Sequence, residues 1–285
     1  MYNFTYHRAS GLRQATNLLE KFEDAKLLAG GQTLLPTMKQ RLASPSDLID
    51  LNQVEGMSGI EATARSLVIG AMTRHADVAR SPVVREHIPA LAELAGMIGD
   101  PAVRHRGTIG GSIANNDPNA DYPAACLGLG ATIVTTKRRI EADEFFQGLF
   151  ETALEPDEII REVSFPLPTK KAAYQKFRNP ASRFALVGVF VARRPSEVRV
   201  AVTGAGASGV FRVPAFEEAL KSRFSPKSIE GMTIPADGLA GDIHGSAEYR
   251  AHLVGVLARR AVAAANAAAS ADSADDTETA EPEAE

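Results

Sequence analysis

The sequence AGGQT at residues 29–33 and the sequence TIGGS at residues 108–112 decide how this chain of 285 residues is interpreted. Each contains two consecutive glycines, and glycine adopts positive φ values without a steric cost. A glycine pair therefore lets successive backbone N–H groups curl into a concave site for an anion. A single pair more often marks a plain turn. Two pairs at this separation predict that both loops bind one diphosphate, from opposite sides.

The composition predicts a globular protein without a pronounced charge. Hydrophobic residues make up 45% of the chain and charged residues 23%, which is enough for two domains with their own cores. The net charge of −4 gives no general attraction to nucleic acid or to an anionic membrane. The N-terminus lacks an apolar signal segment, and no apolar run reaches the ~18 residues of a membrane helix. We therefore expect a cytoplasmic protein with no nucleic-acid partner and no integral membrane segment.

A single cysteine, Cys126, limits the metal chemistry of this chain. It cannot form an internal disulfide, a zinc site with several thiolates, or an iron–sulfur cluster without other chains. Its apolar neighbours indicate a small buried hydrophobe. The six histidines show no H-E-x-x-H spacing, and no G-x-S-x-G motif occurs. We therefore assign no catalytic residue and no metal ligand.

Apolar spacing predicts an alternation of helices and strands. The predicted strands are 47–51, 66–70, 124–135, 187–192 and 198–203. The predicted helices are 12–22, a helix that starts at Ser81-Pro82 and continues to residue 98, and 246–268. Prolines at 166 and 168 mark a linker, because closely spaced prolines interrupt both helices and strands.

These elements divide the chain into three domains and a tail. We expect a first subdomain over 1–60, a second over 61–168 and a C-terminal domain over 169–269. Residues 270–285 are small, polar and acidic, with no aromatic or branched aliphatic side chain. Such a segment cannot bury enough surface to offset the entropy lost on ordering. We therefore predict a disordered acidic tail, with a docking segment as the alternative.

A third glycine motif, GAGASG at residues 204–209, follows a predicted strand and fits the dinucleotide-binding pattern G-x-G-x-x-G. That pattern binds a dinucleotide only where it opens a helix. The following residues, 210–214 (VFRVP), indicate another extended segment that a proline ends. We interpret the motif as a glycine-rich strand connection.

The residues around the first two glycine pairs resemble a known family. The resembling stretches are 27–39 (LLAGGQTLLPTMK), 68–75 (VIGAMTRH), 104–114 (RHRGTIGGSIA), 117–121 (DPNAD) and 174–185 (YQKFRNPASRFA). They are similar to the FAD-binding medium subunit of molybdenum hydroxylases, the carbon monoxide dehydrogenase and xanthine dehydrogenase family. The resemblance implies an α+β protein: a two-subdomain FAD-binding fold of the PCMH (vanillyl-alcohol-oxidase-like) type, followed by a smaller α+β C-terminal domain.

The resemblance also implies which residues bind FAD. The two glycine loops match the diphosphate-binding loops, Asp121 matches an acidic contact, and Ile98 and Ile160 match apolar contacts. Arg178 stands where relatives often carry lysine, and Lys176 is the alternative because arginine does not reproduce lysine geometry. The candidate set is Ala29, Gly30, Gly31, Gln32, Thr33, Leu34, His75, Ile98, Thr108, Ile109, Gly110, Gly111, Ser112, Asp121, Ile160, Lys176 and Arg178.

Two features near the second glycine loop have open interpretations. His75 follows a predicted strand end, so it either approaches the cofactor or is a surface or supporting histidine. Arg104, His105 and Arg106 either form a solvated turn or add positive potential near a diphosphate. For at least one of the three we favour packing or contact with a partner.

The function implied by the resemblance is electron relay. A large molybdopterin subunit would oxidise the substrate, and a small subunit would pass electrons through two [2Fe-2S] clusters. FAD on this chain would deliver them to an external acceptor, in a dimer of heterotrimers. Carbon monoxide is the first substrate hypothesis, followed by purines or N-heterocycles. The alternatives are a self-sufficient FAD oxidoreductase and a non-catalytic nucleotide-binding subunit.

Overall fold

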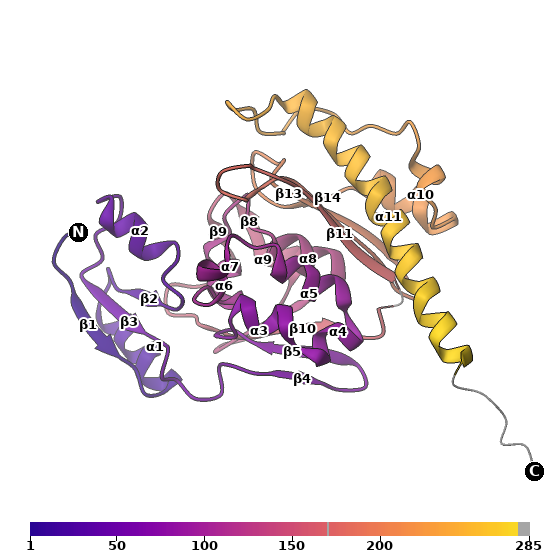
Figure 1. Cartoon of the computed structure of the whole chain (residues 1–285). Coiled ribbons are helices and arrows are strands. Elements are labelled where there is room, and N and C mark those ends of the chain that lie inside the picture. Colours follow the sequence, from indigo (N-terminus) through magenta and orange to yellow (C-terminus); the bar gives the residue numbers. More distant parts are fainter. Residues whose placement is uncertain (170, 279–285) are drawn as a thin grey trace, which may run out of the picture.

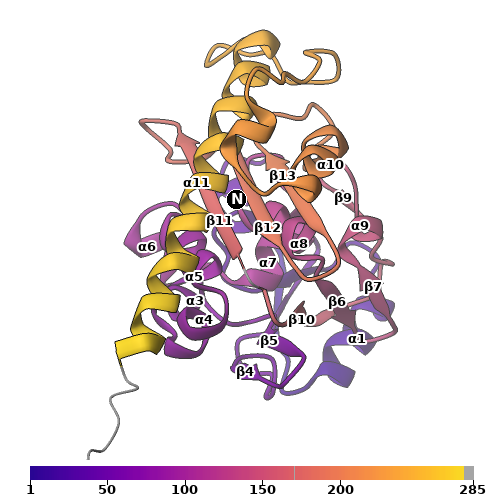
Figure 2. The same cartoon turned by 90° about the vertical axis from the view of Figure 1, so that its right-hand side faces the viewer.

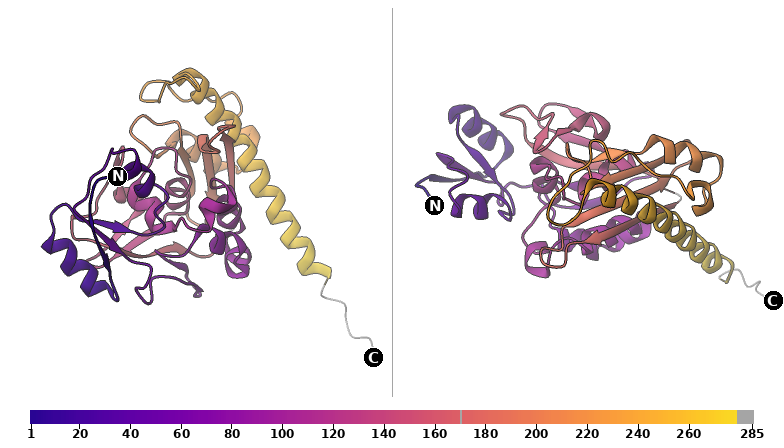
Figure 3. Two further views of the ribbon diagram at one scale, coloured as in Figure 1. Left: turned by 60° about the vertical axis from the view of Figure 1, so that its left-hand side comes forward. Right: turned by 90° about the horizontal axis from the view of Figure 1, so that it is seen from above.

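The computed structural model describes residues 1–169 and 171–278, with side chains up to residue 268. Three main sheets follow one another along the chain, and helices accompany each of them (Figure 1). The first sheet lies within residues 5–50, the second within 60–166 and the third within 171–212. The sheets are separated by residues 51–59 and 167–170, and the domain division at residues 60 and 168 stays a prediction. Figure 3 shows the first subdomain at one end of the molecule and the C-terminal helix at the other.

The first subdomain is a small parallel sheet with strand order β1-β3-β2. Its elements are β1 (Thr5–Arg8), α1 (Leu12–Lys21), β2 (Lys26–Leu28), α2 (Leu34–Lys39) and β3 (Asp47–Asp50). Parallel strands need crossover connections, which α1 and α2 supply. The first glycine loop therefore lies directly beyond the carboxyl end of β2, where open α/β sheets bind ligands.

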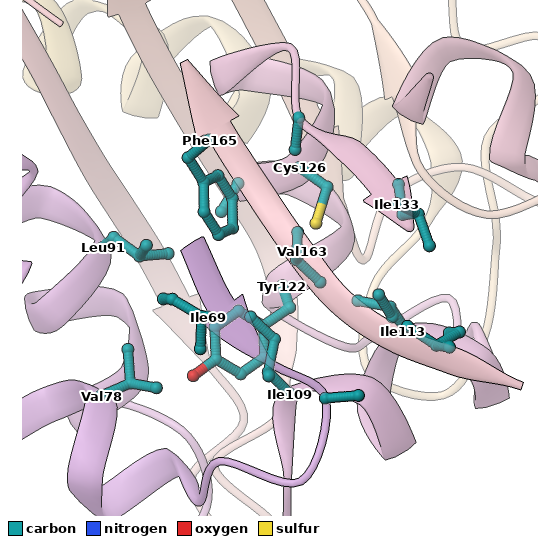
Figure 4. Close-up of a cluster of buried hydrophobic side chains, with 14 of the residues drawn as sticks. Ile69, Val78, Leu91, Ile109, Ile113, Tyr122, Cys126, Ile133, Val163 and Phe165 are labelled. Atoms are coloured by element: carbon teal, nitrogen blue, oxygen red, sulfur yellow. The ribbon is translucent and has the colours of Figure 1, made fainter. Parts of the chain in front are cut away.

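The second subdomain is built on an antiparallel sheet with strand order β4-β5-β10-β6-β7. Its strands are β4 (Ile60–Ala62), β5 (Ser66–Gly70), β6 (Thr132–Thr135), β7 (Arg139–Glu141) and β10 (Ile160–Pro166). In the centre, Val163 pairs with Ile69 on one side and with Ile133 on the other. Figure 4 shows these side chains in one core with Ile109, which belongs to the second glycine loop, and Ile113, which follows it. The core of the sheet thus fixes the position of that loop.

Short helices and one hairpin complete this subdomain. They are α3 (His75–Arg80), α4 (Pro82–His87), α5 (Pro89–Gly96), α6 (Pro101–Arg104), α7 (Ile109–Asn115), α8 (Tyr122–Leu129), α9 (Ala142–Phe145), β8 (Phe146–Gly148) and β9 (Glu151–Thr152). The single helix predicted from residue 81 to 98 is wrong, because Pro89 ends α4 and begins α5. Proline cannot donate the backbone hydrogen bond that a continuing helix needs.

The strand predicted over 124–135 is also wrong in its first half. Residues up to Leu129 form α8, in which every side chain is buried, and only β6 is extended. A helix that is apolar on all sides has no amphipathic period, so its pattern cannot be told from a buried strand. Gly130, with φ of 63°, ends the helix. Cys126 is fully buried in α8, which confirms its interpretation as a small buried hydrophobe.

The C-terminal domain is an antiparallel meander between two helical layers (Figure 2). Its elements are β11 (Lys171–Arg178), β12 (Ala185–Arg193), β13 (Val198–Thr203), β14 (Phe211–Arg212), α10 (Pro214–Ser222), the 3₁₀ helix η1 (Pro226–Ile229) and α11 (Ala247–Glu278). Val189 and Val191 on β12 pack with α10 and α11, whereas Phe190 and Ala192 join the core of the second subdomain. Alternate side chains of one strand therefore connect the two cores.

The glycine motif at 204–209 connects β13 to β14 and opens no helix, which confirms its interpretation. Gly204, with φ of 79°, donates its backbone N–H to the carbonyl of Pro118 at 2.8 Å. A side chain here would meet the carbonyl oxygen of Ala185 at 2.4 Å. The glycine thus serves the packing of the C-terminal domain against the turn that precedes α8.

The predicted closing helix is confirmed, but it extends further than expected. α11 continues through Glu278, so the disorder predicted for residues 270–278 is wrong in the structure. The alanine-rich run before and within this part favours helix, because alanine has the highest intrinsic helix propensity. Residues 279–285 lie outside the described part of the chain. Among the described helices none is long and apolar enough to cross a membrane, and the cytoplasmic location stays a prediction.

Candidate functional site

The first glycine loop presents unpaired backbone donors. Within the described residues, the N–H groups of residues 30–34 have no protein acceptor. Gly31 has φ of 71°, which turns the chain so that these donors precede the first turn of α2. Gln32 and Thr33 are exposed beside them. Consecutive free amides at the start of a helix attract an anion such as a diphosphate.

A polar chain from the first sheet holds this loop in place. Asn52 donates its side-chain amide to the carbonyl of Ala29 at 3.1 Å and to the carboxylate of Asp50 at 2.6 Å. Asp50 also accepts a hydrogen bond from the hydroxyl of Tyr6. Burial would raise the pKa of Asp50, but the hydrogen bonds from Tyr6 and Asn52 outweigh it and lower this pKa. Asp50 therefore stays ionised and keeps Asn52 oriented toward the loop.

The second glycine loop differs from the open anion site that its sequence predicted. Four of its five N–H groups have protein acceptors: Ile109 donates to Thr73 O (3.1 Å), Gly110 to Ala71 O (2.8 Å), Gly111 to Thr108 Oγ1 (3.2 Å) and Ser112 to Thr108 O (3.0 Å). Neither glycine of this pair has positive φ, because both belong to the first turn of α7. Gly110 instead permits close packing: a side chain there would come within 2.5 Å of Ala71 Cβ.

The two glycine loops lie in direct contact. A Cβ atom on Gly30 would lie 2.2 Å from the carbonyl oxygen of Arg106 and 2.7 Å from Gly107 Cα. A Cβ atom on Gly111 would lie 3.5 Å from Ala29 Cβ. The absence of side chains thus brings the free amides of the first loop beside α7. The two loops thus lie side by side, although only the first presents a run of consecutive free donors, and their joint binding of one diphosphate stays a prediction.

His75 packs against Gly107, the residue that precedes the second loop. The side chain is buried, its backbone N–H donates to the carbonyl of Gly107 at 3.0 Å, and its ring packs against Tyr122. A Cβ atom on Gly107 would lie 2.5 Å from His75 Nε2. This placement matches the supporting role, not the surface one.

The buried environment also keeps His75 neutral. Burial, followed by the nearby charge of Arg104, lowers the pKa of His75 from 6.5 to about 4. As the pH falls, His75 is protonated in the unfolded chain before it is protonated in the folded chain. Its contribution to the free energy of unfolding is therefore complete above the pKa of His75 in the unfolded chain, and it decreases as the pH falls toward the pKa in the folded chain.

A buried cluster joins the second subdomain to the C-terminal domain. Asp121, at the start of α8, accepts hydrogen bonds from the Tyr174 hydroxyl at 2.5 Å and from Lys176 Nζ at 2.9 Å. The side chains of Lys176 and Asp121 are only 1% and 3% exposed. Burial raises the pKa of Asp121 even though Lys176 and Tyr174 act to lower it. Two predicted site residues, Asp121 and Lys176, thus form one ion pair.

Replacing Lys176 with methionine is expected to lower the free energy of unfolding by about 3–5 kcal/mol, because the carboxylate of Asp121 would lose its buried partner. The Lys176→Met/Asp121→Asn double variant should recover part of this loss, since no uncompensated charge remains. Urea unfolding of both, compared with the exposed-residue control Lys227→Met, measures the effect. A Lys176→Met loss no larger than that of Lys227→Met would contradict this account of the pair.

The turn at residues 97–99 is held from two sides. Lys176 Nζ donates to the carbonyl of Met97 at 3.2 Å, and Arg104 donates to the carbonyls of Ile98 and Gly99 at 2.9 and 3.2 Å. Ile98 itself is partly exposed. The preference for packing by one of the three basic residues at 104–106 therefore fits Arg104. No sequence pattern pointed to its two backbone acceptors.

Three further candidate residues, Ile109, Ile160 and Arg178, are placed differently from one another. Ile160 is 5% exposed and belongs to the core of the second subdomain, and Ile109 is fully buried there. Arg178 is exposed near the end of β11. Of the two candidate basic residues, Lys176 is the one that contacts other residues of the predicted site.

Comparison with known proteins identifies the family to which this chain belongs. Residues 2–168 match the model of the FAD-binding domain in molybdopterin dehydrogenases. The chain belongs to this family. It is therefore a flavoprotein component of an oxidoreductase, with FAD as its cofactor, and the predicted fold class is confirmed. The open amides at 30–34 fit the diphosphate of FAD, because they offer unpaired donors in a loop that the second loop closes on one side.

Relatives extend the similarity over nearly the whole chain. The nicotine 6-hydroxylase medium subunit of Paenarthrobacter nicotinovorans is 38% identical over 275 residues, covering 92% of this chain and 97% of the relative. The carbon monoxide dehydrogenase medium chain of Hydrogenophaga pseudoflava is 36% identical over 277 residues, covering 92% and 96%. A solved structure of carbon monoxide dehydrogenase from Hydrogenophaga pseudoflava aligns with a TM-score of 0.84 at 36% identity, covering 93% of this chain and 98% of that chain.

Proposed function

We propose that this chain is the electron-relay subunit of a molybdenum hydroxylase complex. FAD, when bound, supplies the redox chemistry by taking electrons from partner clusters and delivering them to an external acceptor. The protein's own task is to bind and orient this cofactor. The observation that carries the proposal is the contact of two glycine loops, one with free amides, beside a buried cluster that joins the domains.

The chain's residues divide this task between them. The amides of residues 30–34 would hold the diphosphate, and Ile98 would offer an apolar surface to the ring system. Lys176 and Arg104 fix the backbone around Ile98, while Asp121 keeps Lys176 in place. The pKa of Asp121 is raised, and its carboxylate is already paired with Lys176. We therefore assign Asp121 a positioning role and no proton transfer. His75 would support the second loop, and we carry the remaining candidate residues, Ile160 and Arg178 among them, forward as proposed contacts of FAD.

The partners follow from the relatives. Both are named medium subunits or medium chains, a name that belongs to a complex with a larger and a smaller subunit. We place the molybdopterin cofactor on the large partner and two [2Fe-2S] clusters on the small one, because this chain has a single buried cysteine. We propose a dimer of such three-subunit units.

The substrate is decided on the large partner. Carbon monoxide is our first substrate to test, and a nicotine-like N-heterocycle is the second, since relatives of both kinds are similar to this chain to nearly the same degree. A self-sufficient FAD oxidoreductase is the rival function. It differs from an electron-relay subunit in needing its own substrate site beside the flavin.

The isolated chain separates relay from self-sufficient enzyme. Loaded with FAD, it is expected to accept electrons from dithionite and to pass them to an artificial acceptor, but to oxidise neither carbon monoxide nor nicotine. The flavin absorbance under anaerobic conditions reports each step. Rapid reduction of the flavin by either substrate, with no partner present, would place the self-sufficient enzyme first.

A further inference from the structure

A recess of the second subdomain is lined by Gly96 and Pro101, which lie on either side of the segment that contains the turn at residues 97–99. It has a volume of about 570 Å³, and helices α3, α4, α5 and α6 of the second subdomain supply its lining residues. Small side chains such as Ala76, Ala79 and Ala92 leave its floor open. Arg80, Arg85, Arg104 and His105 line its rim, and Glu93 is the one carboxylate in the lining. This recess is separate from the free amides of the first glycine loop.

The arginines of this recess have no carboxylate partner within the described residues. Arg85 donates twice to the carbonyl of Ala79, at 3.2 and 3.0 Å, and Arg104 donates to Ile98 and Gly99. Elsewhere, arginines that contact backbone carbonyls, such as Arg199 and Arg250, also pair with a carboxylate. Hydrogen bonds to neutral groups thus position Arg80 and Arg85, and neither forms an ion pair with a carboxylate of the described residues. The charge of Arg104 in addition acts on the carboxylate of Asp100.

His105 completes this arrangement. Its Nδ1 atom lies 2.6 Å from the carbonyl of Pro101, so Nδ1 carries the proton and Nε2 is the free acceptor. Arg80 approaches this Nε2 atom at 3.5 Å. The contact orients the Arg80 guanidinium and leaves its charge unneutralised. Three arginines against one glutamate give the lining a net charge of +2 with His105 neutral.

We propose that this recess binds a small anionic ligand through a phosphate or carboxylate group. Arg80 and Arg85 would hold the anionic group, because a guanidinium forms paired, charge-assisted hydrogen bonds with either kind of oxyanion. The open alanine floor would accept an apolar part of the ligand. One glutamate among three arginines favours an anion over a cation at this site.

The recess is connected to the proposed flavin site through Arg104. The same guanidinium lines the recess and donates to the backbone on both sides of the Ile98–Gly99 peptide, which Lys176 also supports through Met97. A ligand that binds the Arg104 guanidinium would therefore compete with its hydrogen bonds to the turn that contains Ile98. This part of the inference rests on the proposed role of Ile98 beside the flavin, whereas anion binding itself does not.

Isothermal titration calorimetry of the FAD-saturated protein tests the inference, with inorganic pyrophosphate and citrate titrated separately as probes. At least one probe should bind saturably, and Arg80→Gln and Arg85→Gln should each weaken that binding about tenfold or more. Arg13→Gln, an exposed arginine on α1, is the matched control and should leave the affinity unchanged. Pyrophosphate alone would identify a phosphate site, and citrate alone a carboxylate site.

Absence of saturable binding by both probes, or equal binding by the wild type and both recess variants, would overturn the inference. Binding seen only after removal of residues 270–285 would overturn it too, since the acidic tail would then be the occupant. Because calorimetry reports anion binding whether or not electrons flow, its failure is distinguishable from failure of the electron relay.

Discussion

A valine at position 31 or at position 111 is expected to remove most of the FAD from the purified protein. At position 31 the backbone has φ of 71°, where a branched side chain is strained, and the new Cβ would lie 2.9 Å from Leu35 Cδ1. At position 111 it would lie 3.0 Å from Thr108 Oγ1, the atom that caps α7, and 3.5 Å from Ala29 Cβ. The first substitution distorts the loop that carries the free amides, and the second crowds the contact between the two loops.

The flavin-to-protein absorbance ratio of each purified variant measures this effect, and we expect FAD affinity to fall at least tenfold, or about 1.4 kcal/mol. Gly56→Val is the control for position 31, because Gly56 has φ of 74° but open space around it. Gly11→Val is the control for position 111, since nothing lies within 4 Å of its Cβ position. Folded position-31 and position-111 variants with full flavin occupancy would show that the diphosphate lies elsewhere.

Local chemistry explains which parts of the site could be predicted from sequence. The first loop was predictable because its donors need only glycine and a following helix, both of which are written in residues 29–39. The approach of the two loops to each other was predicted from the two glycine pairs and their order, and the family resemblance implies the same. The occupied amides of the second loop could not be predicted, because Ile109 and Gly110 donate to Thr73 and Ala71, which are far from them in the sequence.

Side-chain contacts between residues far apart in the sequence could not be predicted for the same reason. Asn52 reaches Ala29 and Arg104 reaches Ile98 only because the sheets and helices place them there. The pairing of Lys176 with Asp121 joins residues from different domains. For the fold, the strands of the C-terminal domain showed clear apolar runs, whereas α8 is apolar on every side and gave no period to read.

Electron flow from substrate to flavin is expected only when both partner subunits are present. This chain has a single cysteine and no cysteine set for clusters, so in the proposed complex the small subunit would supply the intermediate relay. Because electron transfer falls steeply with distance, the large subunit without the small one should restore little flavin reduction. The effect should be the largest of any described here, since it is close to all or none.

Anaerobic stopped-flow absorbance of the flavin, recorded with each combination of the three subunits, tests this claim most directly. Carbon monoxide and nicotine serve as substrates, and dithionite verifies that the flavin is reducible in every sample. The relay account predicts rapid substrate-driven reduction of the flavin with all three subunits and little with this chain plus the large subunit alone. Equally rapid reduction without the cluster-bearing subunit, or with this chain by itself, would contradict it.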